Sequence, residues 1–152
     1  MQDGFIYDEL SDFRKDLLNQ INNLYPKASK NFIWAEGRKL QKLQKKIAKQ
    51  DIGTTGKSGD KSYHKKFKCT KPTKNGDDLY VKAHNIAPHA YLLEYGHFQV
   101  PRGKKGQSNK GGRPNGWTEG KYVMKKSEMQ FSKTYEEDCE KFLYKYFDDI
   151  GN

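Results

Sequence analysis

The chain has 152 residues, with 29 Lys and Arg against 19 Asp and Glu, so its formal net charge is +10. This length favours a single domain over residues 1–152, and 34% hydrophobic with 13% aromatic residues predicts one thin core that depends strongly on rings. No apolar run reaches the ~18 residues of a membrane span, and residues 1–10 lack the basic-then-apolar order of a signal peptide. We therefore expect a soluble protein made in the cytoplasm, with no membrane partner.

The two cysteines, Cys69 and Cys139, lie far apart and have no second Cys or His at ligand spacing. A zinc site and a disulfide framework both depend on such spacing. We expect two idle thiols and no metal site.

Charge is distributed unevenly along the chain. Residues 38–74 contain 13 Lys and Arg against two acids, whereas residues 127–150 contain seven acids against three Lys. A basic middle and an acidic C-terminal end suit a nucleic-acid face, and they also suit head-to-tail contacts between identical subunits. Both interpretations stay open on composition alone.

The N-terminal third predicts two helices, over residues 6–50, with a break near Tyr25 because Pro26 cannot continue a helix without losing a backbone bond. The first carries a one-face apolar pattern made of Ile6, Leu10, Phe13, Leu17, Ile21 and Leu24. The second runs to about Gln50. Its predicted buried side chains are Phe32, Ile33, Leu40, Leu43 and Ile47. Its predicted solvent face consists of Lys39, Lys42, Lys45, Lys46 and Lys49.

Residues 51–60 predict a loop that contains three glycines. Gly56, Lys57 and Ser58 repeat the last letters of the phosphate-binding loop motif, but Asp51 stands where that motif needs its first glycine, and no apolar strand precedes it. We therefore do not expect nucleotide binding here.

Residues 62–96 predict a β-hairpin followed by a short helix. Runs 62–70 and 78–84 alternate in polarity, and the Asn75-Gly76 pair between them is typical of a tight hairpin turn. The short helix is expected to begin at Pro88 and end at Gly96. The expected fold is α+β, with long N-terminal helices and a C-terminal helix packed on a small antiparallel β-sheet.

Residues 98–121 predict a long flexible basic loop, because they contain six glycines, two prolines and six basic residues. The interval 122–150 returns to helical spacing, with Phe131, Tyr135, Cys139, Phe142, Tyr146 and Ile150 on one face. Either Ser127 with Gln130 or Thr134 with Glu137 is expected to cap this helix.

Catalysis would need converging side chains, and the chain offers few. The candidates are His64, His84, His89, His97, Asp78 and Glu94. Their spacing matches neither a metal-ligand set nor a nucleophile with its base, so we expect no catalytic residues, no cofactor and no enzyme.

A nucleic-acid module is the alternative function, because residues 63–68 alternate aromatic and basic side chains as stacking grooves do. Alternation along a strand, however, puts Tyr63 and Phe67 on one face and Lys66 and Lys68 on the other. Ordinary strand amphipathicity explains the same pattern.

Residues 85–97 read Asn-Ile-Ala-Pro-His-Ala-Tyr-Leu-Leu-Glu-Tyr-Gly-His. This stretch resembles the signature of the phage head-tail joining and tail-completion proteins, of the type named for gene product ten of coliphage HK-ninety-seven. The matching residues are Pro88, Ala90, Glu94, Tyr95 and Gly96. His89 stands where the family has Tyr. Thr55-Gly56 and the segment 116–121 also resemble family segments in the same order, whereas Lys57-Ser58-Gly59 departs from the family pattern.

The resemblance implies a structural virion protein of a tailed bacteriophage or prophage, localised to the neck or tail and present in the host cytoplasm during assembly. It implies a ring of identical subunits, expected to be six, which contacts tail-tube or head-tail connector proteins. Whether such a ring would terminate the tail or act as a head-side adaptor stays open. The expected subunit or partner contacts are Glu94, Tyr95, Gly96, Arg102, Lys104, Lys105, Lys110, Arg113 and Trp117. Some of these basic side chains would make weak contacts with DNA in the lumen.

Overall fold

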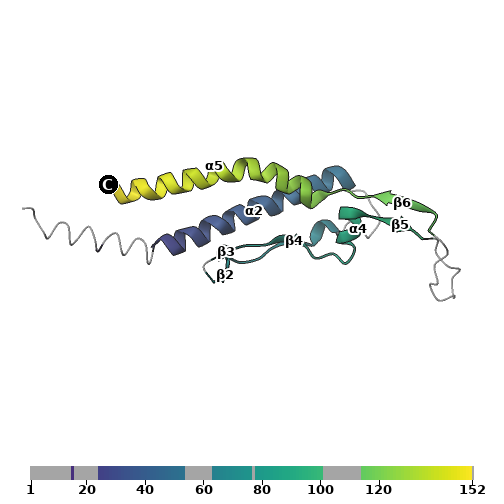
Figure 1. Ribbon diagram of the computed structural model, residues 1–152, viewed down its shortest axis with the longest axis horizontal. Helices are drawn as coiled ribbons and strands as arrows, with labels where there is room; N and C mark the ends of the chain where they lie inside the picture. Colours follow the sequence, from purple (N-terminus) through teal and green to yellow (C-terminus); the bar gives the residue numbers. More distant parts are fainter. Residues whose placement is uncertain (1–14, 16–23, 54–62, 77, 101–113, 152) are drawn as a thin grey trace, which may run out of the picture.

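The computed structural model describes residues 15, 24–53, 63–76, 78–100 and 114–151. Two long helices, α2 (Tyr25–Ile52) and α5 (Val123–Gly151), lie side by side, and a β-hairpin lies against α2 on its other side (Figure 1). This arrangement confirms the predicted α+β fold with its C-terminal helix. Among the described residues, no helix has the length and apolarity needed to cross a membrane.

The second helix was predicted to start between Pro26 and Ser29, and α2 begins slightly earlier, at Tyr25. Pro26 lies in its first turn, where the missing N–H of proline has no intrahelical acceptor to lose. Leu24 also has helical angles (φ −83°, ψ −45°), so the backbone does not turn sharply away there. The helix ends at Ile52, and Gly53 (φ 81°) donates its N–H to the Lys49 carbonyl at 3.2 Å. The predicted helix before α2 lies outside the described residues, apart from Lys15 and Leu24.

The face of α2 that meets the hairpin is more polar than predicted. Gln41 Nε2 donates to the Phe67 carbonyl at 2.8 Å, and Gln44 Nε2 donates to the Ala83 carbonyl at 3.3 Å. Gly37 lies so close to the Val81 side chain that a Cβ would come within 2.5 Å of it. Strand carbonyls at a buried edge need donors, and glutamine supplies them where an apolar stripe could not.

The hairpin is confirmed, in two short ladders. Strand β1 (Phe67–Cys69) pairs with β4 (Ala83–Asn85), and β2 (Thr73–Asn75) pairs with β3 (Asp78–Tyr80). The register shifts by one residue between the ladders, at Pro72, which has no N–H to donate. The predicted turn was one residue early: Asn75 is paired with Asp78, so Gly76 (φ 59°), and not Asn75, opens the two-residue turn.

The first predicted strand was too long at its start. Residues 63–65 form a helical turn, and the strand begins only at Phe67. Tyr63 is nevertheless in the core, at 1% exposure, with its ring 5.2 Å from that of Phe67. The thin core also matches expectation, and its fully buried hydrophobic members in the described part are Ile47, Ala48, Tyr63, Phe67, Ala87 and Val123.

The predicted loop 98–121 is wrong at both ends. Strand β5 (Gly96–Gln99) pairs with β6 (Gly116–Glu119), with Phe98 opposite Trp117. Each of the two strands begins with a glycine, Gly96 or Gly116, which hid their alternation, and each strand finds its partner about twenty residues away. Residues 101–113, including the basic cluster, lie outside the described residues. The expected single sheet is thus three two-stranded ladders.

Helix α5 confirms the predicted C-terminal helix and packs on α2 through rings. Phe32 stacks on Phe142 at 4.5 Å, and Tyr25 meets Tyr146 edge-on at 5.0 Å. Both capping predictions were wrong, because the helix begins at Val123. The hydroxyls of Ser127 and Thr134 donate to the carbonyls of Met124 and Phe131 three residues earlier.

Candidate functional site

The start of α5 is capped by a carboxylate from another helix. Glu94, in the short helix α4 (Ala90–Tyr95), accepts hydrogen bonds from the Met124 N–H at 3.1 and 3.0 Å and from the Lys125 N–H at 3.2 Å. Its side chain is almost fully buried, at 7% residue exposure. A negative charge at a helix N-terminus satisfies unpaired donors and interacts favourably with the helix dipole. Glu94 therefore joins α4 to α5 within one chain.

The backbones around this cap touch one another. The Leu93 carbonyl accepts the Lys121 N–H at 2.7 Å, and the Glu94 carbonyl accepts the Tyr122 N–H at 3.2 Å. A Cβ on Gly120 would come within 2.7 Å of the Tyr95 carbonyl carbon. We call the set Glu94, Gly96 and Gly120, with the first turn of α5, the Glu94 junction.

Gly96 lies opposite Gly120 in this close backbone contact. Its φ is 86°, in the left-handed region that favours glycine, and a Cβ there would lie 2.5 Å from the Thr118 carbonyl oxygen. The expected helix end at Gly96 is confirmed, and its cause is both a backbone angle and a close approach.

Asn85 and Tyr63 stabilise the segment of the chain that leads into the Glu94 junction. The Asn85 side chain donates to the Tyr63 carbonyl at 2.9 Å and accepts the Ala87 N–H at 2.8 Å, which fixes the turn that leads into α4. Burial, with a smaller contribution from the Glu94 charge, raises the pKa of Tyr63 to about 12. The Tyr63 phenol is therefore neutral throughout the physiological range.

Beyond the junction, the β5–β6 hairpin extends away from the helices (Figure 1). Phe98 and Trp117 face each other across it, edge-on at 5.0 Å, yet they remain 64% and 49% exposed. Tyr91 and Tyr95 on α4 are also exposed. We call Tyr91, Tyr95, Phe98 and Trp117 the aromatic arm. Exposed rings on adjoining elements, here α4, β5 and β6, are typical of a partner surface.

The expected contact residues thus separate into three groups. Glu94 and Gly96 are engaged inside the chain, Tyr95 and Trp117 are exposed on the arm, and the five basic residues at 102, 104, 105, 110 and 113 lie outside the described residues. Sequence reasoning missed Phe98 and Tyr91. Only the β5–β6 register, which sets Phe98 opposite Trp117, identifies Phe98 as part of a surface.

Two of the candidate catalytic side chains, His64 and His89, have rings near Tyr63, at 5.9 and 6.2 Å. His64 Nε2 contacts the Gly53 carbonyl at 2.7 Å, and His84 Nδ1 contacts the Lys82 carbonyl at 3.4 Å. In the part of the chain that the structure describes, no three His, Cys, Asp or Glu side chains gather as metal ligands. An open groove of about 650 Å³ lies beside Gln44 and Glu94. Both Glu94 carboxylate oxygens already accept backbone hydrogen bonds at the start of α5.

In comparisons with known protein families, with curated proteins and with solved structures, the chain matches none.

Proposed function

We propose that the protein is a structural component of a tailed bacteriophage or prophage virion, a ring-forming protein of the neck or tail end. The observation that carries this proposal is the aromatic arm. A two-stranded hairpin is only marginally stable alone in water, and this one exposes Phe98 and Trp117 instead of burying them in its own chain. A surface of this kind favours permanent contact with another protein.

The resemblance to phage joining proteins supports the same function, and the geometry gives a structural reason for several residues of the shared motif. Asn85, Glu94 and Gly96 have folding roles: they fix a turn, cap a helix and permit a close backbone contact. Tyr95 and Trp117 are exposed. A motif made of folding residues around an exposed aromatic surface suits a protein that assembles.

In this proposal the arm contacts a neighbouring copy in a ring of six, and the ring contacts tail-tube or head-tail connector proteins. We propose further that some of the five basic residues Arg102, Lys104, Lys105, Lys110 and Arg113 make weak, salt-sensitive contacts with DNA in the lumen. The protein would act in the virion neck or tail without catalytic residues or cofactor.

Absolute mass in solution tests the proposal. Light scattering over a concentration series should give a closed oligomer near six subunits for the wild type. Phe98→Ser/Trp117→Ser should stay folded and lose the oligomer, because the arm then has no apolar surface to bury. Ile86→Ser is the matched control, since it removes an exposed apolar side chain (48% exposed) outside the arm. A wild type that remains monomeric throughout the series would overturn the proposal.

A small basic nucleic-acid-binding module is the second candidate, and the exposed lysines of α2 favour it. Such a module would bind duplex DNA as a monomer, with affinity falling steeply as salt rises. The same light-scattering series, repeated with a DNA duplex, separates this candidate from the ring.

A further inference from the structure

The free side of α2 is a continuous basic stripe. Positions spaced by three and four residues lie on one helix face, and those on this face are exposed, except the half-buried Lys45. They are Lys27, Asn31, Trp34, Arg38, Lys42, Lys45 and Lys49, and we call them the α2 stripe. The stripe also contains an aromatic residue, Trp34, which is 40% exposed, and the Arg38 guanidinium lies over its ring at 5.5 Å.

Contacts within the chain leave this stripe uncovered. Gln41 and Gln44 point to the hairpin, and Phe32 and Lys39 point to α5. The stripe occupies the remaining side of the helix, away from both. A face with five cations along one helix is either a solvated surface or a site for a partner with negative charge.

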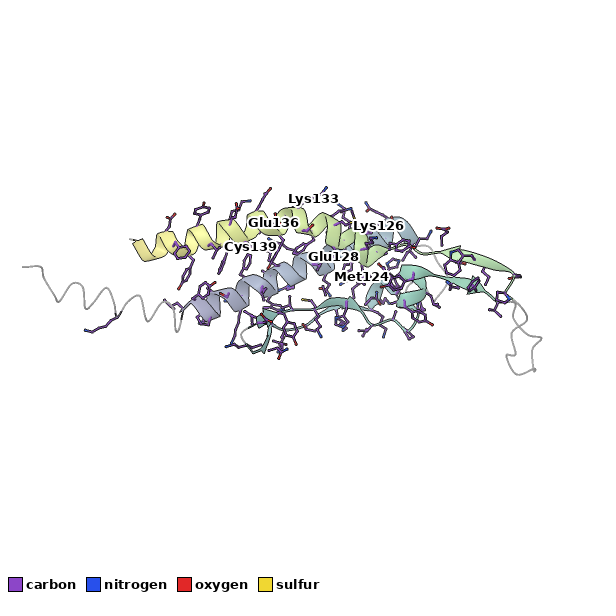
Figure 2. All side chains as sticks on the ribbon, in the orientation of Figure 1. Met124, Lys126, Glu128, Lys133, Glu136 and Cys139 are labelled. Atoms are coloured by element: carbon purple, nitrogen blue, oxygen red, sulfur yellow. The ribbon has the colours of Figure 1, made fainter. Side chains whose placement is uncertain are left out.

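Helix α5 has an exposed stripe of the opposite sign. The residues on its side away from α2 are Met129, Lys133, Glu136, Glu140, Tyr144 and Phe147, and we call them the α5 stripe. Figure 2 shows Lys133 on this outer side and Cys139 on the inner side. Met129, Tyr144 and Phe147 are each more than 60% exposed. The α5 stripe itself contains two Glu against one Lys, and the whole of α5 contains seven acids against five Lys.

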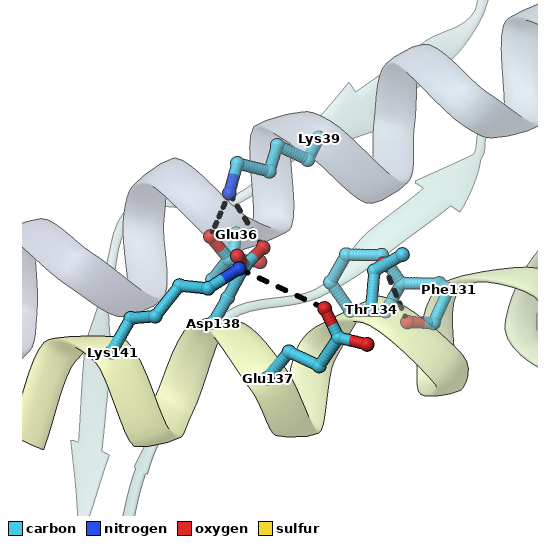
Figure 3. A network of polar contacts seen from close by, with 7 residues as sticks. All are labelled: Glu36, Lys39, Phe131, Thr134, Glu137, Asp138 and Lys141. Carbon is cyan, nitrogen blue, oxygen red and sulfur yellow. Dashed lines mark hydrogen bonds and ion pairs between the residues drawn. The ribbon is translucent and has the colours of Figure 1, made fainter.

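The ion pairs that the structure describes in α2 and α5 do not involve the charged residues of the two stripes. Lys39 joins Glu36 at 2.6 Å to Asp138 at 2.8 Å across the helix interface, and Lys141 pairs with Glu137 at 3.7 Å (Figure 3). Within the described residues, Glu136 and Glu140 make no ion pair, and neither do Lys42 and Lys49.

We propose that the α2 stripe of one copy docks against the α5 stripe of a second copy. The two helices have nearly equal lengths, 28 and 29 residues, opposite charge, and exposed aromatic side chains within each stripe. The stripes face in different directions on one chain, so each docking leaves a further stripe free, and the contact propagates until a ring closes. This inference rests on the proposed ring and adds a second contact between neighbouring subunits, beside that of the aromatic arm.

The exposed rings favour a protein partner over nucleic acid for the α2 stripe. A DNA duplex would bind only the cations of the α2 stripe and would give no reason for the α5 stripe. A second copy of the chain would bind both stripes. Exposed charge pairs of this kind mainly set partner choice and register, and salt weakens them.

Charge exchange between the helices tests the interface in the full-length chain. Lys42→Glu/Lys49→Glu and Glu136→Lys/Glu140→Lys should each raise the concentration at which the oligomer dissociates by at least about tenfold. The four substitutions together should restore wild-type assembly, because the attraction is re-formed with its signs exchanged. Lys68→Glu/Lys71→Glu is the control, with the same charge change on exposed hairpin positions. Circular dichroism confirms that each variant is folded.

Each possible result of these measurements either supports the proposed interface or overturns it. An oligomer that forms in the wild type and ignores both helix variants overturns this interface and leaves the ring standing, as does a combined variant that fails to recover. Loss of DNA-duplex binding in the α2 variant, with assembly unchanged, assigns the stripe to nucleic acid and also overturns it. A wild type that is monomeric at every concentration removes the proposed function and this interface together.

Discussion

The Glu94 junction and the aromatic arm share Gly96 as their boundary, and their side chains are used in opposite ways. At the junction, Glu94 is 7% exposed and bonded to the first N–H groups of α5. Two residues after Gly96, Phe98 is 64% exposed and touches Trp117 across the hairpin. Substitutions in the junction should therefore reduce the stability of one chain, whereas substitutions in the arm should reduce assembly and leave the chain stable.

The largest loss of stability is expected for Gly120→Ala. The new Cβ would meet only backbone atoms, the Glu94 oxygen, the Tyr95 carbonyl carbon at 2.7 Å and the Gly96 nitrogen at 2.9 Å. Backbone cannot move aside as a flexible side chain can, so we expect the free energy of unfolding to fall by about 3 kcal/mol. Urea denaturation measures it.

Gly116→Ala is the matched control in β6, next to Trp117 of the aromatic arm. Its Cβ would meet only the Gln99 side chain, at 3.2 Å from Oε1, which can rotate away. We expect a change within about 0.5 kcal/mol. Equal losses for the two alanine variants would contradict the contrast between junction and arm.

Glu94→Ala should have the next largest effect. It removes the acceptor for the Met124 and Lys125 N–H groups and the negative charge at the start of α5. We expect the free energy of unfolding to fall by about 2 kcal/mol, and by about half as much for Glu94→Gln, which keeps an acceptor oxygen. Glu128→Ala removes an exposed carboxylate in the same helix and should change stability by less than about 0.5 kcal/mol. If Glu94→Ala matches that control, the cap does not stabilise the chain.

The long helices could be predicted from sequence because their apolar spacing repeats over many turns. The stripe of Phe131, Tyr135 and Phe142 predicted α5, and proline and glycine marked the two ends of α2. The predicted hairpin turn lay one residue too early. Glycine is accepted at both central positions of a two-residue turn, so the sequence did not fix whether Gly76 takes the first or the second position.

The candidate site was less accessible to sequence reasoning. Its residues are joined by contacts between distant segments: Glu94 bonds to Met124, thirty residues later, and Phe98 meets Trp117. Local capping rules pointed to Ser127, because a cap supplied by another helix leaves no signature within four residues of the helix start. Glycines in β5 and β6 likewise concealed these two strands, which carry the exposed Phe98 and Trp117 side chains.

The last prediction concerns Tyr63, whose effect on stability appears only at high pH. Its pKa is raised to about 12 in the folded chain against 10.0 for an ordinary tyrosine, so between these values the folded state keeps a proton that the unfolded state has lost. The unfolded state then binds fewer protons, and the free energy of unfolding falls by about 1.4 kcal/mol per pH unit from pH 10 upward, levelling off near pH 12. Tyr63→Phe keeps the ring that packs on Phe67 and removes the titrating group, so its stability should fall less steeply over this range in urea titrations. Lysines titrate equally in both proteins, and Phe98→Ser/Trp117→Ser should follow the wild-type slope, since the arm lies outside the core. Parallel curves for wild type and Tyr63→Phe would mean that the phenol beneath the Glu94 junction is reached by water, and that the junction is no better closed than the arm.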